Sequence, residues 1–337
     1  MNFLKKYLFV IGIGTLVFSM GCGLDDSPDD DSSKIEETPF SVPKFSSDSA
    51  YQFIEKQLSF GPRVPNSEAH QLAKNWLVEK FQSFDATVIE QDFTATAYNG
   101  TVLNGTNIIA QYNPEIKQRL LFAAHWDSRH LADSPINEER KKEPILAADD
   151  GGSGVAVLLE IGRVLQENGL KNMGVDLILF DAEDYGDDNR ENSNMDSWCL
   201  GSRHWSKNLH VENYRPKYGV LLDMVGSKGA TFPKEGKSMR FAPNVVKKIW
   251  DLAQILGYGN YFTNNRGEVG IDDHVPVNVN AGIPMVDIIN MSQGTQTGFG
   301  LHWHTHNDNM DIISKKTLRI VGTVMLEVIY REAAGKL

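Results

Sequence analysis

The chain has 337 residues, of which 41% are hydrophobic and 23% are charged, and its formal net charge is −11 at pH 7. This acidic balance, without a clustered basic patch, argues against a nucleic-acid partner. With only two cysteines, the chain is not a disulfide-stabilised scaffold, and its stability must come from a hydrophobic core.

The first 21 residues are typical of a lipoprotein-type signal peptide. Lys5 and Lys6 form a short positive region, an uncharged apolar stretch follows over 7–20, and Gly21 directly precedes Cys22. The apolar stretch is too short for a confident membrane span. We expect cleavage before Cys22 and lipid attachment to it; an ordinary signal peptide with an incidental cysteine is the alternative. The protein would then be exported and lipid-anchored to a bacterial membrane, facing the periplasm or the cell surface.

Residues 22–40 are acidic and lack an apolar face. Such a segment cannot bury enough surface to order itself, so we expect a flexible tether. The remainder, 41–337, has a size suited to a single catalytic α/β domain. If Cys22 carries lipid, Cys199 is the only thiol left, and we expect it to be a small buried residue and not a nucleophile.

Helical and strand-like segments alternate through this domain. In chain order, the predicted elements are helices at 46–60 and 67–84, strands at 86–98, 107–112 and 119–124, a helix at 152–165, strands at 175–180 and 219–222, a helix at 245–256, a strand at 285–289 and a helix at 314–332. Serines are placed to cap the first two helices. This order predicts a single α/β domain with a central, twisted, mostly parallel mixed sheet flanked by α-helices.

Carboxylate and imidazole side chains gather at the ends of the predicted strands and helices, and in open α/β sheets ligands bind beyond the carboxyl ends of the strands. Six groups share this placement: His125-Trp-Asp127, Asp149-Asp150, Glu183-Asp184, Asp223, Asp272-Asp273-His274 and His302-Trp-His304-Thr-His306. Imidazole nitrogen and carboxylate oxygen without cysteine form the ligand set of a catalytic zinc, which keeps one position open for water or substrate. Glu183 and Asp184 are adjacent, so one can bind the metal while the other acts as a general base.

Several histidines remain ambiguous on spacing alone. His302 and His306 flank His304, and alternate residues of an extended segment share a face, so all three are candidate ligands. His130 and His210 have no motif context, and we predict that they face solvent.

The ordered motifs resemble the zinc aminopeptidase family from about residue 50 to the C-terminal helix. The resemblance rests on His125-x-Asp127, on Asp150 in Asp-x-x-Ser-Gly, and on Glu183-Asp184, Asp223 and His304. Within that family the chain is more similar to the glutaminyl cyclases. Four stretches carry this second resemblance: Asp181-Ala-Glu-Asp184, Gly201-Ser-Arg-His204, Asp272-Asp-His-Val-Pro276, and Trp303-His-Thr305 followed by Asp308-Asn309.

The resemblance implies one zinc ion per chain, bound by Asp150, Asp184 and His304. It also implies that Glu183 is the general base. Asp184 stands where many animal cyclases have Glu, and its shorter side chain would shift the metal or bind it through one oxygen.

Further roles follow from the same resemblance. Asp223 and Asp273 would form an acidic network with Glu183 that replaces a second metal, and Trp303 and Trp198 would line the substrate pocket. The doublets Asp149-Asp150 and Asp272-Asp273 leave a one-residue ambiguity, in which motif spacing favours Asp150 and the position next to His274 favours Asp273.

The implied reaction converts the N-terminal glutamine of peptides and proteins into pyroglutamate and releases ammonia. The alternative is a two-zinc aminopeptidase that removes N-terminal residues, with His125 and Asp223 holding the second zinc. A third reading, a catalytically inactive binding lipoprotein, is disfavoured because Glu183 and every metal position are intact. We expect peptides with N-terminal glutamine as partners, no nucleic acid, membrane contact only through the lipid at Cys22, and a monomer.

Overall fold

The computed structural model describes residues 40–188, 194–292 and 294–337. The predicted signal peptide, Cys22 and all but the last residue of the predicted tether lie outside the described residues. Within the described residues, Ser41 to Leu337 belong to one compact unit. No helix in this part of the chain is long and apolar enough to cross a membrane.

A six-stranded sheet forms the centre of the described chain, in the order β1-β2-β4-β3-β5-β8. Its strands are β1 (Thr87–Thr96), β2 (Val102–Tyr112), β3 (Arg119–His125), β4 (Gly174–Phe180), β5 (Gly219–Asp223) and β8 (Met285–Ile289). The last four strands of that order run parallel, whereas β2 pairs antiparallel with both β1 and β4. Every residue of β3, β4, β5 and β8 is buried, as expected for parallel strands covered on both faces. The predicted α/β fold with a mixed, mostly parallel sheet is confirmed.

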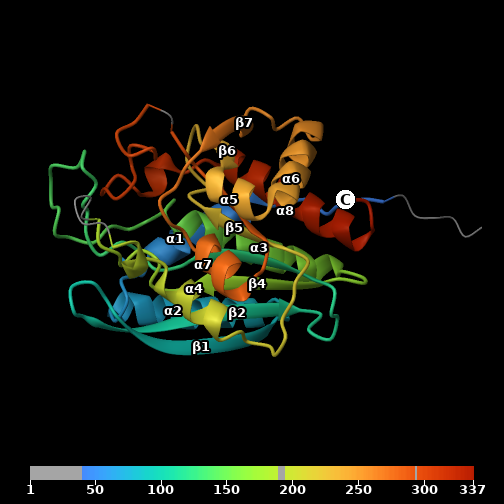
Figure 1. Ribbon diagram of the computed structural model, residues 1–337, viewed down its shortest axis with the longest axis horizontal. Helices are drawn as coiled ribbons and strands as arrows, with labels where there is room; N and C mark the ends of the chain where they lie inside the picture. Colours follow the sequence, from blue (N-terminus) through green and yellow to red (C-terminus); the bar gives the residue numbers. More distant parts are fainter. Residues whose placement is uncertain (1–39, 189–193, 293) are drawn as a thin grey trace, which may run out of the picture. The chain divides into compact units, whose positions relative to one another are not determined.

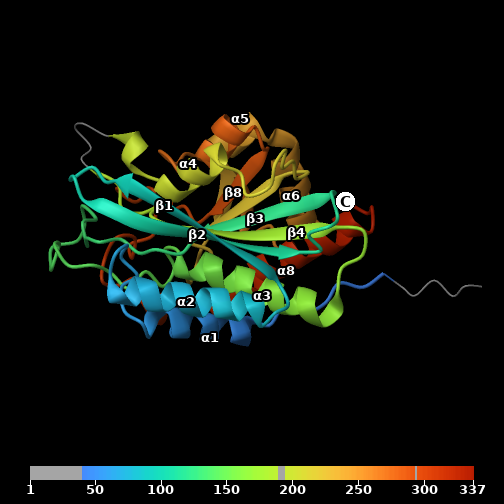
Figure 2. The same ribbon diagram turned by 90° about the horizontal axis from the view of Figure 1, so that it is seen from below.

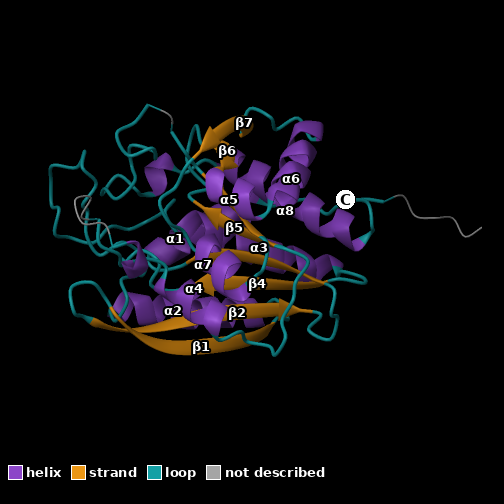
Figure 3. Ribbon diagram, viewed as in Figure 1, coloured by secondary structure: helices purple, strands orange, loops and turns teal. Residues whose placement is uncertain are grey.

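Helices cover both faces of this sheet (Figures 1 and 3). Their bounds are α1 (Ser47–Leu58), α2 (Glu68–Gln82), α3 (Gly152–Asn168), α4 (Leu200–Lys207), α5 (Gly236–Phe241), α6 (Pro243–Ile255), α7 (His274–Pro276) and α8 (Lys315–Ala333). Figure 2 shows α1, α2 and α3 on one face and α4 and α5 on the other. The predicted serine caps are present: Ser46 and Ser67 each accept a hydrogen bond from the backbone N–H three residues later.

Some elements were not predicted from the sequence. These are α4, α5, α7 and the two-stranded sheet of β6 (Phe232–Glu235) and β7 (Phe262–Gly267). They are short, and β7 is mostly polar, so no hydrophobic period marks it. The rings of Phe232 and Phe262 pack 5.3 Å apart, a contact between segments distant in sequence. Asp272 and Asp273 precede β8, with α7 and a π-helical turn at Val277–Ala281 in between.

The start of α3 packs directly against the ends of β3 and β5. The Ser153 hydroxyl donates to the Asp149 carbonyl at 2.6 Å and accepts from the Val225 N–H at 2.8 Å. A Cβ atom on Gly154 would lie 2.2 Å from the Leu222 carbonyl oxygen. The Ser-Gly pair of the Asp-x-x-Ser-Gly motif therefore permits the close approach that places Asp150 at the edge of the sheet.

Gly154→Ala tests this packing. Because the added methyl group would meet backbone, we expect a loss of about 1–3 kcal/mol in the free energy of unfolding, measured by denaturant titration. Gly236→Ala is the matched control, since its Cβ would meet only the end of the Glu268 side chain, which is exposed and can rotate away. Equal stability of the two variants would contradict the packing argument.

Candidate active site

Three predicted metal ligands meet at the carboxyl edge of the sheet. Asp150 lies just before α3, Asp184 follows β4, and His304 comes from the loop after β8. His304 Nε2 lies 3.1 Å from Asp184 Oδ1 and 3.6 Å from Asp150 Oδ2. Among the described residues, nothing donates a hydrogen bond to the buried Asp150 Oδ2 and Asp184 Oδ2. One ligand atom from each of the three residues lies within 4.8 Å of the others, and this pair of carboxylates beside one imidazole fits the ligand set of a zinc ion.

The hydrogen-bond partners of the neighbouring aspartate and histidines show which residues of each run face the metal group. Asp149 faces away from the group, because its Oδ2 lies 2.9 Å from His302 Nε2 and its Oδ1 accepts the Gly226 N–H. His306 contacts the Arg140 carbonyl instead. Asp150 and His304 are thus the members of each run that face the metal group.

A second group of possible ligands adjoins the first and shares Asp150 with it. His125 Nε2 lies 3.1 Å from Asp150 Oδ1 and 3.3 Å from Asp223 Oδ1. These three residues also converge within 4.8 Å. The geometry therefore assembles the positions that a second metal ion would require.

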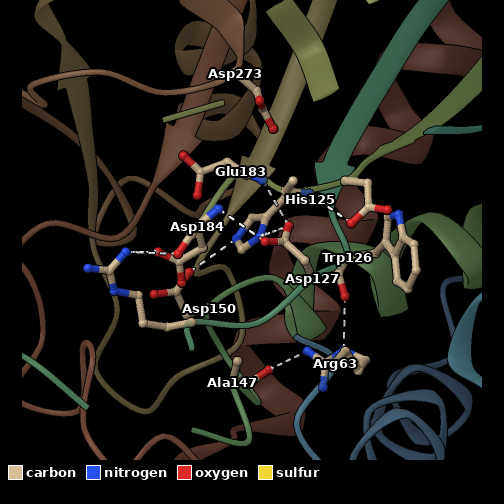
Figure 4. A network of polar contacts seen from close by, with 12 residues as sticks. Arg63, His125, Trp126, Asp127, Ala147, Asp150, Glu183, Asp184 and Asp273 are labelled. Atoms are coloured by element: carbon tan, nitrogen blue, oxygen red, sulfur yellow. Dashed lines mark hydrogen bonds and ion pairs between the residues drawn. The ribbon is translucent and has the colours of Figure 1, made fainter. Parts of the chain in front are cut away.

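Glu183 is buried next to the metal group, with an exposed fraction of 9%. Burial, together with the negative charges of Asp184 and Asp273, raises the pKa of its carboxyl group well above the usual value, although nearby His125 opposes the shift. Burial likewise raises the pKa of Asp273 well above its usual value and that of Asp223 to about 8. Figure 4 shows Asp273 and Asp184 on either side of Glu183. Asp184 and Asp273 thus lie beside the candidate base, and Asp223 and Asp272 line the same pocket.

Asp127 holds the backbone of the Glu183-Asp184 pair. Its Oδ1 and Oδ2 accept the N–H groups of Glu183 and Asp184, each at 3.1 Å (Figure 4). The sequence placed Asp127 in a motif but assigned it no role. Because both oxygens hold backbone N–H groups, Asp127 fixes the turn on which the base and a metal ligand stand.

Cys199 is fully buried, as predicted, but it also contacts the candidate base. Its thiol donates to Glu183 Oε1 at 3.2 Å, and its N–H donates to the Glu183 carbonyl at 3.0 Å. Burial and the charge of Glu183 raise the pKa of the thiol well above its usual value, so it stays protonated as a donor. Its left-handed backbone, with φ of 60°, turns the side chain toward Glu183. No sequence signal indicated this contact.

Asp133 and Arg129 contact two of the predicted metal ligands on the side away from the pocket. Asp133 Oδ1 lies 3.4 Å from His304 Nδ1, on the ring nitrogen opposite the metal group. Asp133 also pairs with Arg129, which donates to the carbonyls of Asp184 and Gly186. A carboxylate on the second nitrogen of a metal-binding histidine orients the ring and raises its basicity. These two residues belong to no motif, and sequence reasoning missed both.

Trp198 and Trp303, the two predicted substrate-binding residues, line the pocket that also contains Asp150, Asp184 and His304. The rings of Trp303 and His304 stack with centroids 3.7 Å apart, and the Trp198 ring lies nearly parallel to His304 at 6.1 Å. The Arg129 guanidinium lies 4.7 Å from the Trp198 ring centroid and holds it in place. Glu183 and Asp223 line the same pocket, so the indoles and the carboxylates face one space.

The prediction that His130 and His210 face solvent is wrong. Both are half-buried. The His130 ring stacks on Tyr185 at 3.8 Å, and His210 Nδ1 accepts the Trp205 Nε1–H at 3.1 Å. Aromatic neighbours supplied by other segments cover both rings, which a search for local motifs could not detect.

Comparison with known proteins places this geometry in a family. The profile of peptidase family M28 matches residues 107–329. The chain belongs to peptidase family M28. It resembles the crystal structure of Porphyromonas gingivalis glutaminyl cyclase at 48% identity and a TM-score of 0.82, over 86% of this chain and 99% of that one. A Zn-dependent exopeptidase from Parabacteroides distasonis matches at 46% identity and a TM-score of 0.83, with the same coverage of both chains. Bovine glutaminyl-peptide cyclotransferase is 26% identical over 307 residues, covering 80% of this chain and 79% of that protein.

Asp133→Asn tests the support of His304. The substitution keeps the side-chain volume but removes the negative charge next to His304 Nδ1, so we expect zinc affinity to fall about 10–100-fold. Competition with a chelator of known affinity measures this change. Asp251→Asn is the control, because Asp251 forms an ion pair with Lys247 on the exposed side of α6 and belongs to no group of candidate ligands among the described residues. Unchanged zinc affinity in Asp133→Asn would refute the supporting role.

Proposed function

We propose that this protein is a zinc-dependent glutaminyl-peptide cyclotransferase, which converts N-terminal glutamine into pyroglutamate and releases ammonia. The observation that carries the proposal is the position of Glu183: it lies beside the metal group, in a pocket lined by two indole rings. The cyclases among the relatives support the same activity.

We assign one catalytic zinc ion to Asp150, Asp184 and His304. When bound there, zinc supplies positive charge that stabilises an oxygen atom gaining negative charge. The unpaired oxygens of Asp150 and Asp184 support this assignment. Asp133, behind His304, keeps its imidazole ring directed at the metal position.

Glu183 moves the proton in the proposed reaction. Its carboxylate accepts a proton from the substrate α-amino group as the amino nitrogen forms a bond to the carbonyl carbon of the γ-carboxamide group. The bond from that carbonyl carbon to the amide nitrogen then breaks, and Glu183 returns the proton to that nitrogen, which leaves as ammonia. The thiol of Cys199 and the acidic groups of Asp223 and Asp273 hold the carboxylate and set its proton affinity.

The pocket selects the substrate by its shape and polarity. Trp198 and Trp303 present apolar faces suited to the methylene groups of a glutamine side chain. Met224, Ile289 and Phe299 extend this apolar lining. Only the start of a peptide would then place both an amine and a γ-amide beside Glu183.

A two-zinc aminopeptidase remains the second candidate. The group of His125, Asp150 and Asp223 is the specific observation in its favour, and an exopeptidase is among the relatives. Such an enzyme would use Glu183 to activate water and not an amine.

We further propose that the protein is exported and held at a bacterial membrane by a lipid on Cys22, with residues 22–40 as a tether, and that it acts as a monomer. The signal-like first 21 residues support export, and the acidic composition of the following segment supports the tether.

Two assays run side by side test the activity. We expect ammonia release from a peptide with N-terminal glutamine, lost after chelation and restored by zinc, and no hydrolysis of an aminoacyl amide. Glu183→Gln should retain zinc but lose turnover, because glutamine cannot accept the proton. Hydrolysis of the amide without ammonia from the glutamine peptide would shift the assignment to the aminopeptidase. Full turnover by the Glu183→Gln variant would refute the assignment of Glu183 as the general base.

The pH profile tests the electrostatics of Glu183. A base works when ionised, so a raised pKa means that kcat/KM declines as pH falls through a value above about 4.3, the ordinary glutamate pKa. Asp273 contributes to that raised pKa. Asp273→Asn should therefore move the acidic limb of the profile to lower pH, whatever its effect on the maximal rate. An acidic limb that stays at the same pH or moves to higher pH would contradict this electrostatic role. Asp251→Asn, which removes a negative charge far from the pocket, is the control.

A further inference from the structure

One stretch that carries the sequence resemblance, Gly201-Ser-Arg-His204, has no part in the proposed reaction. It lies in the first turns of α4. The Gly201 N–H donates to the Asp181 carbonyl at 3.0 Å, and a Cβ atom on Gly201 would lie 2.3 Å from the same oxygen. Glycine therefore lets α4 approach the turn that carries Glu183. The role of Arg203, two residues later, follows from what its side chain contacts.

The Arg203 side chain folds back along the chain and holds the segment that comes directly before α4. Its Nε donates to the Trp198 carbonyl at 2.8 Å, and its Nη2 donates to the Met195 carbonyl at 2.9 Å. Its Nη1 lies 3.0 Å from Asp196 Oδ1. Because the planar guanidinium group presents its donors in fixed directions, one side chain sets the positions of both ends of the segment 195–198.

Both ends of this segment line the candidate active-site pocket. At one end, the Trp198 ring packs on Gly186, where a Cβ atom would lie 2.0 Å from Trp198 Cδ2, and its Nε1 donates to the Asp187 carbonyl at 3.2 Å. At the other end, a Cβ atom on Gly270 would lie 3.0 Å from Met195 Cε, and Gly270 also lines the pocket. The segment is therefore a wall of the pocket, and the guanidinium group holds its backbone.

We propose that Arg203 is a positioning residue for substrate binding: by fixing the segment 195–198 it presents the Trp198 indole as a preformed wall for the side chain of an N-terminal glutamine. This inference rests on the proposed cyclase activity. The described lining of the pocket does not include Arg203, so Arg203 acts through Trp198 and not by contact with the substrate. A wall that is ordered before binding removes an entropy cost from binding. Arg203 thus strengthens substrate binding and takes no part in proton transfer.

A surface ion pair that only stabilises α4 is the competing explanation of Arg203. The Asp196 side chain is 87% exposed, and ion pairs at exposed positions contribute little to stability. The two hydrogen bonds to carbonyl oxygens, in contrast, both end on residues of the pocket wall. For that reason we favour the positioning role.

Steady-state kinetics of Arg203→Lys test the proposal. Lysine keeps the charge, but its compact ammonium group cannot reproduce the planar fork of donors. Ordering one large side chain on binding weakens affinity about tenfold, so we expect KM for a peptide with N-terminal glutamine to rise about tenfold and kcat to change less than about twofold. A merely structural role would lower the amount of active enzyme, and hence the apparent kcat, at unchanged KM.

Arg215→Lys is the matched control. Arg215 is exposed, donates to the Tyr214 carbonyl at 2.8 Å and does not belong to the described lining of the pocket. We expect its KM and kcat to equal those of the unaltered protein. An unchanged KM in Arg203→Lys, or an equal rise of KM in both variants, would overturn the proposal.

A double-mutant comparison tests whether Arg203 acts through the indole. Trp198→Ala removes the ring, so adding Arg203→Lys to it should change KM by less than about twofold. A further tenfold rise of KM in the double variant would show that Arg203 acts by another route and would overturn the proposal.

Hydrogen exchange measures the wall without any turnover. We expect the backbone N–H groups of residues 195–199 to exchange faster in Arg203→Lys than in the unaltered protein or in Arg215→Lys. Unchanged exchange would refute the positioning role. If the unaltered protein releases no ammonia from the glutamine peptide, the proposed activity fails, whereas faster exchange in Arg203→Lys still supports the positioning of the wall. The two failures are therefore distinguishable.

Discussion

Negative charge concentrated at one buried edge of the sheet is the constraint on which the rest of the structure depends. Five carboxyl groups, those of Asp150, Glu183, Asp184, Asp223 and Asp273, lie there with the imidazoles of His125 and His304. Removing carboxylates from water raises their pKa values, and their mutual repulsion raises them further. Such a group is stable only with protons or cations among its members. Metal binding and proton transfer at this edge both follow from that requirement.

Other buried carboxylates hold the loops that carry the site. Asp127 binds the N–H groups of Glu183 and Asp184, and Asp308 binds those of Asp149 and Asp150. Each carboxylate thus satisfies two backbone donors that would otherwise be buried without partners. The acidic residues therefore divide into two classes: those that face the pocket and those that position the backbone beneath it.

Several non-glycine residues around the pocket have left-handed backbone conformations. Ala182, Cys199, Met224 and His304 have φ values of 52°, 60°, 47° and 53°, in the left-handed region that non-glycine residues rarely adopt. All four adjoin or belong to the candidate site. Such strain persists where surrounding contacts determine the conformation, and it is typical of functional sites. At His304 it directs the imidazole into the metal group, and at Cys199 it directs the thiol toward Glu183.

Much of the fold could be predicted because its main elements have strong local signals. Mainly apolar runs marked β3, β4, β5 and β8, and capping serines marked the starts of α1 and α2. The short polar strand β7 and helix α4 have no such signal, since distant contacts stabilise them. The supporting roles of Asp133 and Cys199 were missed for the same reason.

The sequence by itself determined the family resemblance, the order of the longer helices and of the strands of the central sheet, and the residue types able to bind zinc. Each of these is encoded by neighbouring residues or by regular spacing. Only the tertiary structure decided which member of the Asp149-Asp150 doublet faces the pocket. Asp149 and Asp150 are adjacent in the chain, yet one faces His302 and the other the metal group. That choice depends on how strands distant in sequence bring their loops together, and on which partner each buried carboxylate meets when they do.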